Sequence, residues 1–278
     1  MYKINISIII IDERGKYMGK ELLGNIELNR IYQMDCLEGM KLIPDKSIDM
    51  ILCDLPYGTT QNKWDSIIPL DKLWEQYNRV IKNNGMICLT SAEPFTSMLI
   101  TSNIKMFRYD LIWEKSHAVG FLNARRMPMR KHENILTFYK KLPIYNPQIE
   151  DKPKENIRPI STKNRLTSNY GDFDEGNHRT IPIDKTYPAS VLRIPNESKT
   201  TTFHPTQKPV KLFEWLIKSF TNENEIVLDN CMGSGTTAVA CILNKRKWIG
   251  FETDAKYIEL ANKRLEQIQL EDDLGKYE

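Results

Sequence analysis

The stretch Val-Leu-Asp-Asn-Cys-Met-Gly-Ser-Gly-Thr-Thr-Ala (227 to 238) is typical of a short strand that passes through a glycine turn into a helix. Glycine lets the backbone approach a bound ligand closely, and the first turn of a helix presents unpaired backbone N–H groups. Glu252 closes the next apolar run, 17 residues after Gly235. Nucleotide-binding α/β folds place there the acidic residue that binds ribose hydroxyls. The stretch therefore predicts an α/β fold with a nucleotide-like cofactor.

Two cofactors are compatible with these glycines. The G-x-G-x-x-A pattern (233 to 238) also suits the pyrophosphate of NAD, so a dehydrogenase is one alternative. Asp229, just before the glycines, would repel a pyrophosphate, whereas it suits the ammonium and sulfonium of S-adenosylmethionine. Upstream, Phe-His-Pro-Thr-Gln-Lys-Pro-Val (203 to 210) offers the Thr206 hydroxyl and the Lys208 ammonium to a carboxylate. Together these groups favour S-adenosylmethionine.

Strand-like and helix-like runs alternate over most of the chain. The strand-like runs are 28–34, 48–53, 85–90, 108–114, 133–139, 225–229 and 247–252, and the helix-like runs are 36–43, 70–82, 94–102, the residues from 235 onward, and 254–268. This alternation predicts a mostly parallel sheet with helices on both faces. The short link between the strands at 108–114 and 133–139 indicates an antiparallel hairpin at the edge of the sheet.

Composition places limits on the class of protein. The 278 residues, 41% of them hydrophobic, suit one α/β domain or a core with an inserted subdomain. The five cysteines form no C-x-x-C pair, which predicts neither a metal site nor a disulfide framework but a reduced, cytoplasmic protein. Residues 115 to 200 hold 16 Lys+Arg against 9 Asp+Glu, a net charge of +7. That basic segment indicates a phosphate-rich partner or, alternatively, a solvated basic surface.

Asp-Leu-Pro-Tyr-Gly (54 to 58) directly follows a strand-like run. The Asp54 carboxylate can accept a hydrogen bond from an exocyclic amine, Pro56 fixes the backbone, and Tyr57 offers a stacking face. The segment therefore predicts a clamp for a flat ring that carries an amine. The alternative is an ordinary turn, because Asp, Pro and Gly are common turn residues.

Five segments carry a resemblance to a known family. In chain order they are Asp-Cys (35 to 36), Asp-Leu-Pro-Tyr (54 to 57), His-Pro-Thr-Gln-Lys-Pro (204 to 209), Leu-Asp-Asn-Cys-Met-Gly-Ser-Gly-Thr-Thr (228 to 237) and Phe-Glu (251 to 252). In this order, and from about residue 26 to 268, the chain resembles the β-group DNA amino-methyltransferases, with their motifs D-P-P-Y, H-P-T-Q-K-P and L-D-P-F-M-G-S-G-T-T. Leu55 departs from the first motif, and Asn230-Cys231 replaces the Pro-Phe of the last.

The resemblance implies a Rossmann-like, S-adenosylmethionine-dependent methyltransferase fold. The implied cofactor site consists of Asp35, Cys36, His204, Thr206, Lys208, Asp229, Gly233, Gly235, Thr236, Thr237 and Glu252. The implied catalytic segment is Asp54, Leu55, Pro56 and Tyr57, in which Asp54 and the Leu55 carbonyl accept hydrogen bonds from the amine of a flipped base while Tyr57 stacks on it. The aromatic missing at Cys231 would pack against the cofactor or base, so we expect its loss to weaken cofactor binding.

Double-stranded DNA is the implied substrate, and Arg125, Arg126, Arg130 and Lys131 are the candidate DNA contacts. In this family Asp at the first motif position is typical of action on adenine N6 and Ser of action on cytosine N4. Asp54 therefore favours adenine, with cytosine N4 as the alternative and RNA or protein amines as more distant ones. Restriction–modification proteins of this kind also suggest a homodimer and a cognate restriction endonuclease as partners.

These observations predict four parts of the chain. They are an N-terminal appendage (1–25), the catalytic half of the α/β domain (26–115), a basic target-recognition insert (116–203) with a core edge strand near 132–140, and the cofactor-binding half (204–278). The insert holds 8 of the 14 prolines, which is typical of irregular, loop-rich structure.

Overall fold

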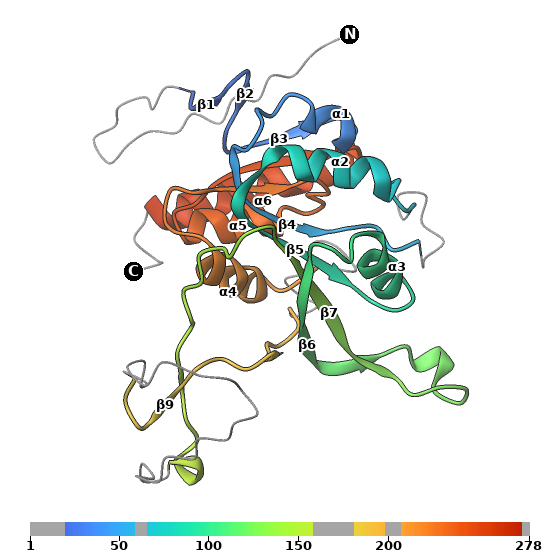
Figure 1. Ribbon diagram of the computed structural model, residues 1–278, viewed down its shortest axis with the longest axis vertical. Helices are drawn as coiled ribbons and strands as arrows, with labels where there is room; N and C mark the ends of the chain where they lie inside the picture. The colour runs from blue at the N-terminus through green and yellow to red at the C-terminus, as the bar shows by residue number, and fades with distance from the viewer. Residues whose placement is uncertain (1–19, 59–65, 158–180, 198–206, 274–278) are drawn as a thin grey trace.

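The computed structural model describes residues 20–58, 66–157, 181–197 and 207–273. Within these residues eight strands form one sheet, in the order β10-β6-β7-β5-β4-β11-β12-β3 (Figure 1). Their bounds are β3 Arg30–Gln33, β4 Ile48–Asp54, β5 Ile81–Ser91, β6 Phe107–Val119, β7 Arg130–Phe138, β10 Val191–Arg193, β11 Ile226–Asp229 and β12 Lys247–Glu252. The helices are α1 Cys36–Met40, α2 Leu70–Val80, α3 Phe95–Ser102, α4 Val210–Phe220, α5 Thr236–Leu243 and α6 Ala255–Asp273.

Two antiparallel pairs of very short strands accompany the sheet in the described ranges. β1 (Leu22–Leu23) pairs with β2 (Ile26–Glu27), and β8 (Glu150–Asp151) pairs with β9 (Lys185–Thr186). Residues 1–19, most of the expected appendage, lie outside the described residues. None of the helices in the described ranges combines the length and apolar character that a membrane crossing requires.

The strand directions agree with the alternation of the sequence. β3, β12, β11, β4 and β5 are parallel neighbours, whereas β7 runs antiparallel to both β5 and β6. The strand expected at the edge near 132–140 is not an edge strand, because β7 lies between β5 and β6. The edge belongs instead to β10, which pairs with β6. β10 has only three residues, of which Leu192 alone is buried, and a run of three residues is too short to be recognised as a strand from the sequence.

The sheet is buried on both faces. Along β4, Ile51 and Cys53 belong to a hydrophobic cluster that includes residues of α1, α2 and α3. Met50 and Leu52, which point the other way, belong to a second cluster with residues of α4, α5 and α6. A parallel strand covered by helices on both faces needs a continuous apolar run rather than an alternating one. That requirement explains the Met-Ile-Leu-Cys run that leads to Asp54.

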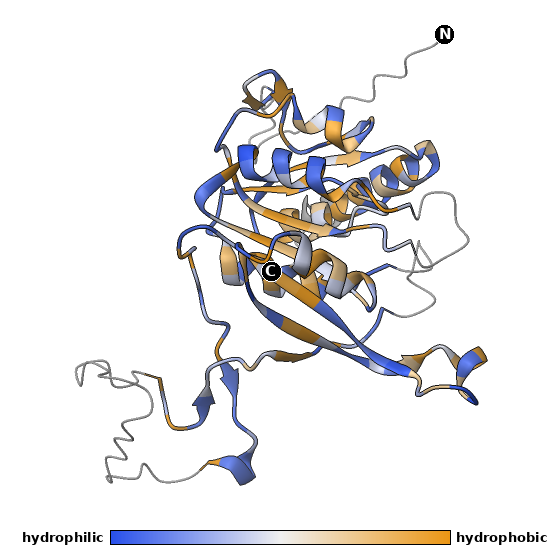
Figure 2. Cartoon of the chain, turned by 45° about the vertical axis from the view of Figure 1, so that its right-hand side comes forward, coloured by the Kyte–Doolittle hydropathy of each residue, from blue (hydrophilic) through white to orange (hydrophobic). Residues whose placement is uncertain are grey.

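The antiparallel strands β6 and β7 continue beyond the sheet as a projecting hairpin (Figure 1). Their register shifts between Glu114 and Val119, after which Val119 pairs with Arg130. The connection at 120–129 contains a short 3-10 turn, Phe121–Asn123, and is exposed throughout. Figure 2 shows hydrophobic and hydrophilic residues side by side at this tip. β6 runs without a break through the expected domain boundary at 116, so the hairpin extends the core sheet.

Candidate active site

The carboxyl ends of parallel strands meet at one edge of a sheet. At this edge a cavity of about 570 Å³ lies among the residues that follow β3, β4, β11 and β12. The residues singled out from the sequence that line it are Asp35, Cys36, Asp54, Leu55, Pro56, Tyr57, Arg130, Lys208, Asp229, Gly233, Thr236 and Glu252. The cavity therefore brings together segments from both halves of the chain.

The glycine turn at the start of α5 needs its glycines for different reasons. Gly233 has φ +52° and Gly235 has φ +81°, in the left-handed region that side chains with a Cβ rarely adopt. A Cβ on Gly235 would also lie 3.0 Å from the Cβ of Ala261 in α6. Gly233 lines the cavity, whereas Gly235 does not and instead lets α5 pack against α6.

Glu252, at the end of β12, is held by the backbone. Its Oε2 accepts a hydrogen bond from the N–H of Gly233 at 2.9 Å. Its Oε1 accepts from the N–H groups of Thr253 at 2.8 Å and Asp254 at 2.9 Å. These three bonds fix the carboxylate at the cavity wall, as expected for a group that orients a ligand.

Asp229, at the end of β11, is a buried carboxylate. Its Oδ1 accepts a hydrogen bond from the Cys231 N–H at 3.0 Å, and its Oδ2 accepts one from the Thr237 hydroxyl. Burial raises the pKa of Asp229 to about 6, although the hydrogen bonds from Thr237 and Cys231 act in the opposite direction. Thr237 does not line the cavity, and its contact is with Asp229.

The two departures from the glycine motif have partners of their own. The Asn230 side-chain carbonyl accepts a hydrogen bond of 2.6 Å from the hydroxyl of Tyr77, a buried residue of α2. The Cys231 thiol interacts with the thiols of Cys36 and Cys53. Burial raises the pKa of Cys53 to about 12, so it remains a neutral thiol near pH 7. Cys36 is the first residue of α1, and Asp35 caps this helix by accepting hydrogen bonds from the N–H groups of residues 37 and 38.

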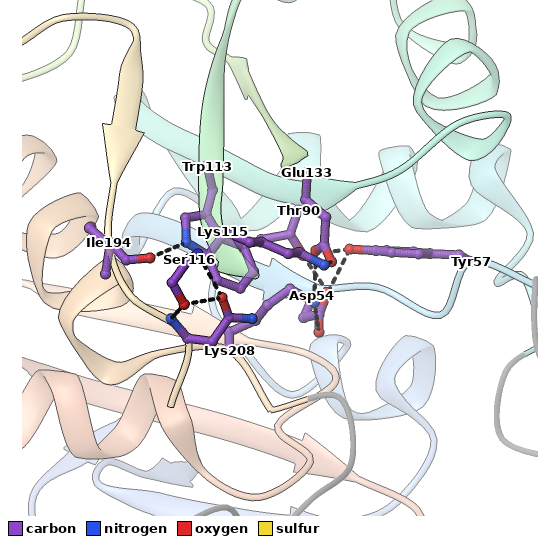
Figure 3. Close-up of polar contacts among 10 residues, drawn as sticks. Asp54, Tyr57, Thr90, Trp113, Lys115, Ser116, Glu133, Ile194 and Lys208 are labelled. Atoms are coloured by element: carbon purple, nitrogen blue, oxygen red, sulfur yellow. Dashed lines mark hydrogen bonds and ion pairs between the residues drawn. The ribbon is translucent and has the colours of Figure 1, made fainter. Parts of the chain in front are cut away.

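Asp54 has donors on both carboxylate oxygens (Figure 3). Its Oδ1 accepts hydrogen bonds from the Tyr57 hydroxyl at 2.8 Å and from the Thr90 hydroxyl, and its Oδ2 accepts one from Lys208 Nζ at 2.6 Å. Burial, with the negative charges of Asp54 and Glu133, raises the pKa of Tyr57 well above its usual value, so Tyr57 stays a donor. The Tyr57 ring stacks on Phe95 with centroids 5.4 Å apart.

Lys208 links Asp54 to a second pair of charges. Its ammonium lies 3.3 Å from Glu133 Oε2, and Glu133 Oε1 accepts a hydrogen bond from Lys115 (Figure 3). Burial would lower the pKa of Lys208, but Asp54 and Glu133 outweigh it and raise the pKa above its usual value. We call Asp54, Lys208, Glu133 and Lys115 the charge network. The sequence predicts that Lys208 binds the carboxylate of the cofactor. In the structure its ammonium contacts the carboxylates of Asp54 and Glu133.

Several residues of the site were not found from the sequence. They are Thr90, Lys115, Glu133, Tyr77 and Arg264. Arg264 is buried in α6 and donates hydrogen bonds to the Ser234 carbonyl and the Thr236 hydroxyl, both at 3.2 Å, so it supports the glycine turn. Lys115 and Glu133 could have been identified from one feature of the sequence, because each is a charged residue beside an apolar strand run.

The remaining predicted residues are His204, Thr206 and the basic residues of the insert. His204 and Thr206 lie outside the described residues. Arg125 and Arg126 lie in the exposed hairpin tip, and Lys131 forms an ion pair of 3.0 Å with Glu114. Arg130 is exposed and also lines the cavity, so the two arms of the hairpin lead from the tip to the rim of the cavity.

A Rossmann-like sheet whose strand ends place Asp54, Asp229 and Glu252 around one cavity, beside a glycine turn, is the arrangement of an enzyme that uses a nucleoside cofactor. Residues 48–263 match the model of the DNA methylase family that comprises N6 and N4 methyltransferases, and the chain belongs to that family. It is an S-adenosylmethionine-dependent DNA methyltransferase. The predicted family, fold and cofactor are confirmed, and the dehydrogenase alternative is set aside.

Two curated relatives match over most of their length. The type II methyltransferase M1.MboII of Moraxella bovis is 29% identical, with 88% of this chain and 99% of the relative covered. The DNA adenine methyltransferase YhdJ of Escherichia coli (strain K12) is 27% identical, with 86% and 83% covered.

Solved structures give the same fold. The complex of M1.HpyAVI with S-adenosylmethionine has a TM-score of 0.57 at 25% identity, and 84% of this chain and 98% of that one are covered. The PvuII DNA methyltransferase, which is cytosine-N4-specific, has a TM-score of 0.61 at 18% identity, with 89% and 91% covered. At that identity the second likeness supports the fold alone.

Proposed function

We propose that this enzyme transfers the methyl group of S-adenosylmethionine to the N6 amine of an adenine flipped out of double-stranded DNA. The observation that carries the proposal is the shared cavity. The Asp54 carboxylate opens into the same space as Asp229 and Glu252. A base beside Asp54 and a nucleoside cofactor beside Glu252 therefore occupy one enclosure, as direct transfer between them requires.

The cofactor side suits S-adenosylmethionine. When bound, this cofactor supplies an electrophilic methyl group on a sulfonium. The negative charges of Asp229 and Glu252 complement the ammonium and the ribose hydroxyls of the cofactor. The glycine turn lets the protein backbone approach the cofactor closely. We assign Asp35, Cys36, Asp229, Gly233, Thr236 and Glu252 to direct contact because they line the cavity. Gly235 and Thr237 shape the turn behind them.

On the opposite side, Asp54 and the Leu55 carbonyl accept hydrogen bonds from the target amine and so direct its nitrogen lone pair toward the methyl group. Tyr57 holds Asp54 Oδ1 through its hydroxyl at 2.8 Å. An amino nitrogen attacks a sulfonium methyl directly, so no cysteine is needed as a nucleophile. Asp rather than Ser at position 54 supports adenine, and cytosine N4 is the rival outcome.

The hairpin is the proposed DNA-binding surface. Arg125 and Arg126 lie in its tip beside Phe121 and Leu122, which are 78% and 96% exposed. Arginines bind phosphates or base edges, and exposed apolar side chains pack against unstacked bases. Val119 and Arg130 line the same cavity as Asp54, which supports the delivery of a flipped base to Asp54 from a duplex held by the tip.

The product of the reaction tests this proposal. The purified protein would be incubated with labelled S-adenosylmethionine and a pool of random-sequence duplexes, and the DNA then digested to nucleosides. N6-methyladenine is the expected product, with Asp54→Ala as the inactive control. N4-methylcytosine would establish the rival activity, and unlabelled DNA with active cofactor binding would overturn both.

A further inference from the structure

The ammonium of Lys208 lies between two carboxylates. Nζ is 2.6 Å from Asp54 Oδ2 and 3.3 Å from Glu133 Oε2. The Lys208 side chain is 7% exposed and that of Glu133 is 15% exposed, so water screens this contact weakly. Among the described residues, Glu133 Oε2 lies farther from the Lys208 ammonium than Asp54 Oδ2 does and has no closer hydrogen-bond donor. Glu133 therefore offers Lys208 a second carboxylate that is already within ion-pair distance.

Asp54 has limited room for a target amine. A carboxylate oxygen has about two lone-pair directions for hydrogen bonds. At Oδ1 both directions are occupied by hydroxyls: Thr90 donates to Oδ1, and the single Tyr57 proton has Oδ1 as its nearer acceptor, at 2.8 Å against 3.0 Å for Thr90 Oγ1. The amine must therefore approach Oδ2, where Lys208 already lies. The positive charge that develops on the attacking nitrogen also disfavours an ammonium at this oxygen.

We propose that Glu133 is a positioning residue that receives Lys208 when the target base enters, and thereby frees Asp54 Oδ2 for the amine. This inference rests on the proposed function. Lys115 binds Glu133 Oε1 and leaves Oε2 directed at Lys208. Since Lys208 already contacts both carboxylates, the exchange needs only a small shift and never leaves the buried ammonium without a counter-charge.

Glu133→Gln tests this role, because the amide keeps the shape of the side chain and loses its charge. Lys208 then has Asp54 as its only carboxylate and competes with the amine. We expect kcat to fall about tenfold or more, with the dissociation constant for S-adenosylmethionine within about twofold of the wild type. A wild-type kcat would overturn the proposal, as would a fall explained by lost folding or lost cofactor binding.

A matched control removes a similar carboxylate away from the cavity. Asp49, at the start of β4, has an 11% exposed side chain and pairs with Lys82 at 2.6 Å. Asp49→Asn should lower thermal stability and leave kcat unchanged. If Asp49→Asn lowers kcat as much as Glu133→Gln does, the effect is general destabilisation and the positioning role is wrong.

A double-mutant cycle tests whether Glu133 acts through Lys208. Lys208→Met and the Glu133→Gln/Lys208→Met double variant should have equal kcat, because no ammonium remains to be moved. Effects that multiply instead would overturn the proposal. Methyl transfer by the wild type is measured alongside, so that failure of the cycle and failure of the proposed function are distinguishable.

A spectroscopic measurement covers the case in which Lys208→Met has no measurable turnover. The ¹⁵N signal of Lys208 Nζ, assigned by its loss in that variant, should shift when a methylatable duplex and S-adenosylhomocysteine are added to the wild type. It should not shift in Glu133→Gln. A signal that responds equally in both proteins, or in neither, would overturn the exchange.

Discussion

The charge network and the hairpin tip differ in how their side chains are held. In the network, Asp54 has donors on both oxygens and Lys208 contacts two carboxylates, in a setting with little exposure. At the tip, Arg125 and Arg126 are exposed and Leu122 is 96% exposed. The proposed reacting groups are thus held in place before substrate arrives, whereas the proposed DNA contacts are left to be ordered by DNA. Turnover and DNA affinity should therefore be separable by mutation.

The largest effect is expected at Asp54. Asp54→Ala removes the acceptor for the amine and leaves Lys208 paired with Glu133 alone, so we expect methyl transfer to fall by about 10²- to 10³-fold or more. DNA and cofactor affinities should stay near those of the wild type. Single-turnover transfer measured beside cofactor calorimetry checks this. Turnover near the wild-type rate would show that Asp54 and the charge network do not take part in methyl transfer.

The opposite variant is Arg125→Ala/Arg126→Ala at the tip. Loss of two cationic contacts should weaken duplex binding by about tenfold or more, with single-turnover transfer at saturating DNA unchanged. Fluorescence anisotropy measures the binding. Lys256→Ala/Lys263→Ala, which removes two exposed charges from α6, is the control. Equal losses in the two double variants would mean that net charge, rather than the hairpin, attracts DNA.

A smaller effect follows from the pKa of Asp229, which is about 6 in the folded protein. Ionised Asp229 attracts a cationic cofactor, so affinity for S-adenosylmethionine should rise by up to about tenfold between pH 5 and pH 7. Asp229→Asn should remove this dependence while DNA affinity keeps its own pH profile. Calorimetry across this range is decisive, and a flat wild-type profile would contradict the assignment.

The same pKa affects the stability of the cofactor-free protein with the opposite sign. The folded state holds the Asp229 proton up to about pH 6, whereas the unfolded chain releases it near 3.8. The unfolded state binds fewer protons in this window, so stability should fall as pH rises from about 4 to 6, by at most about 3 kcal/mol. Thermal unfolding of the wild type and Asp229→Asn measures the difference.

The smallest effect is expected for Leu122→Ala. The side chain is almost fully exposed, so its loss should leave thermal stability unchanged and weaken binding of a methylatable duplex by about threefold to tenfold. Leu270→Ala in α6, which removes a side chain that is 63% exposed, is the control. If DNA binding is unaffected, Leu122 does not contact the duplex.

Local pattern was sufficient for most of the fold. The strand and helix runs agree with the observed elements within a few residues, because parallel strands such as β4 have continuous apolar runs with polar ends. The turn at 233–235 was predictable because its backbone requires glycine. The position of β7 was not, since pairing between distant strands depends on which other strands compete for the same edge.

Contacts between distant parts of the chain also limit how much of the site can be predicted from the sequence. Asp54 and Asp229 follow recognisable strands, but the partner of Asp54 lies 154 residues away in the chain. Glu133 sits in a strand that pairs antiparallel between β5 and β6, and only that pairing brings it to Lys208. The thiols of Cys36, Cys53 and Cys231 likewise come from α1, β4 and the turn between β11 and α5. Such groups become visible only when the topology is known.

The charge network contains two cationic and two anionic groups and so carries no net charge. From outside the protein its field falls away quickly, and it releases no counterions when DNA binds. The exposed arginines of the hairpin, as proposed DNA contacts, instead attract the phosphates and release counterions when they bind them. Added salt should therefore slow the capture of DNA and leave the methyl-transfer rate constant of the assembled complex unchanged, so that ionic strength alone separates docking from chemistry.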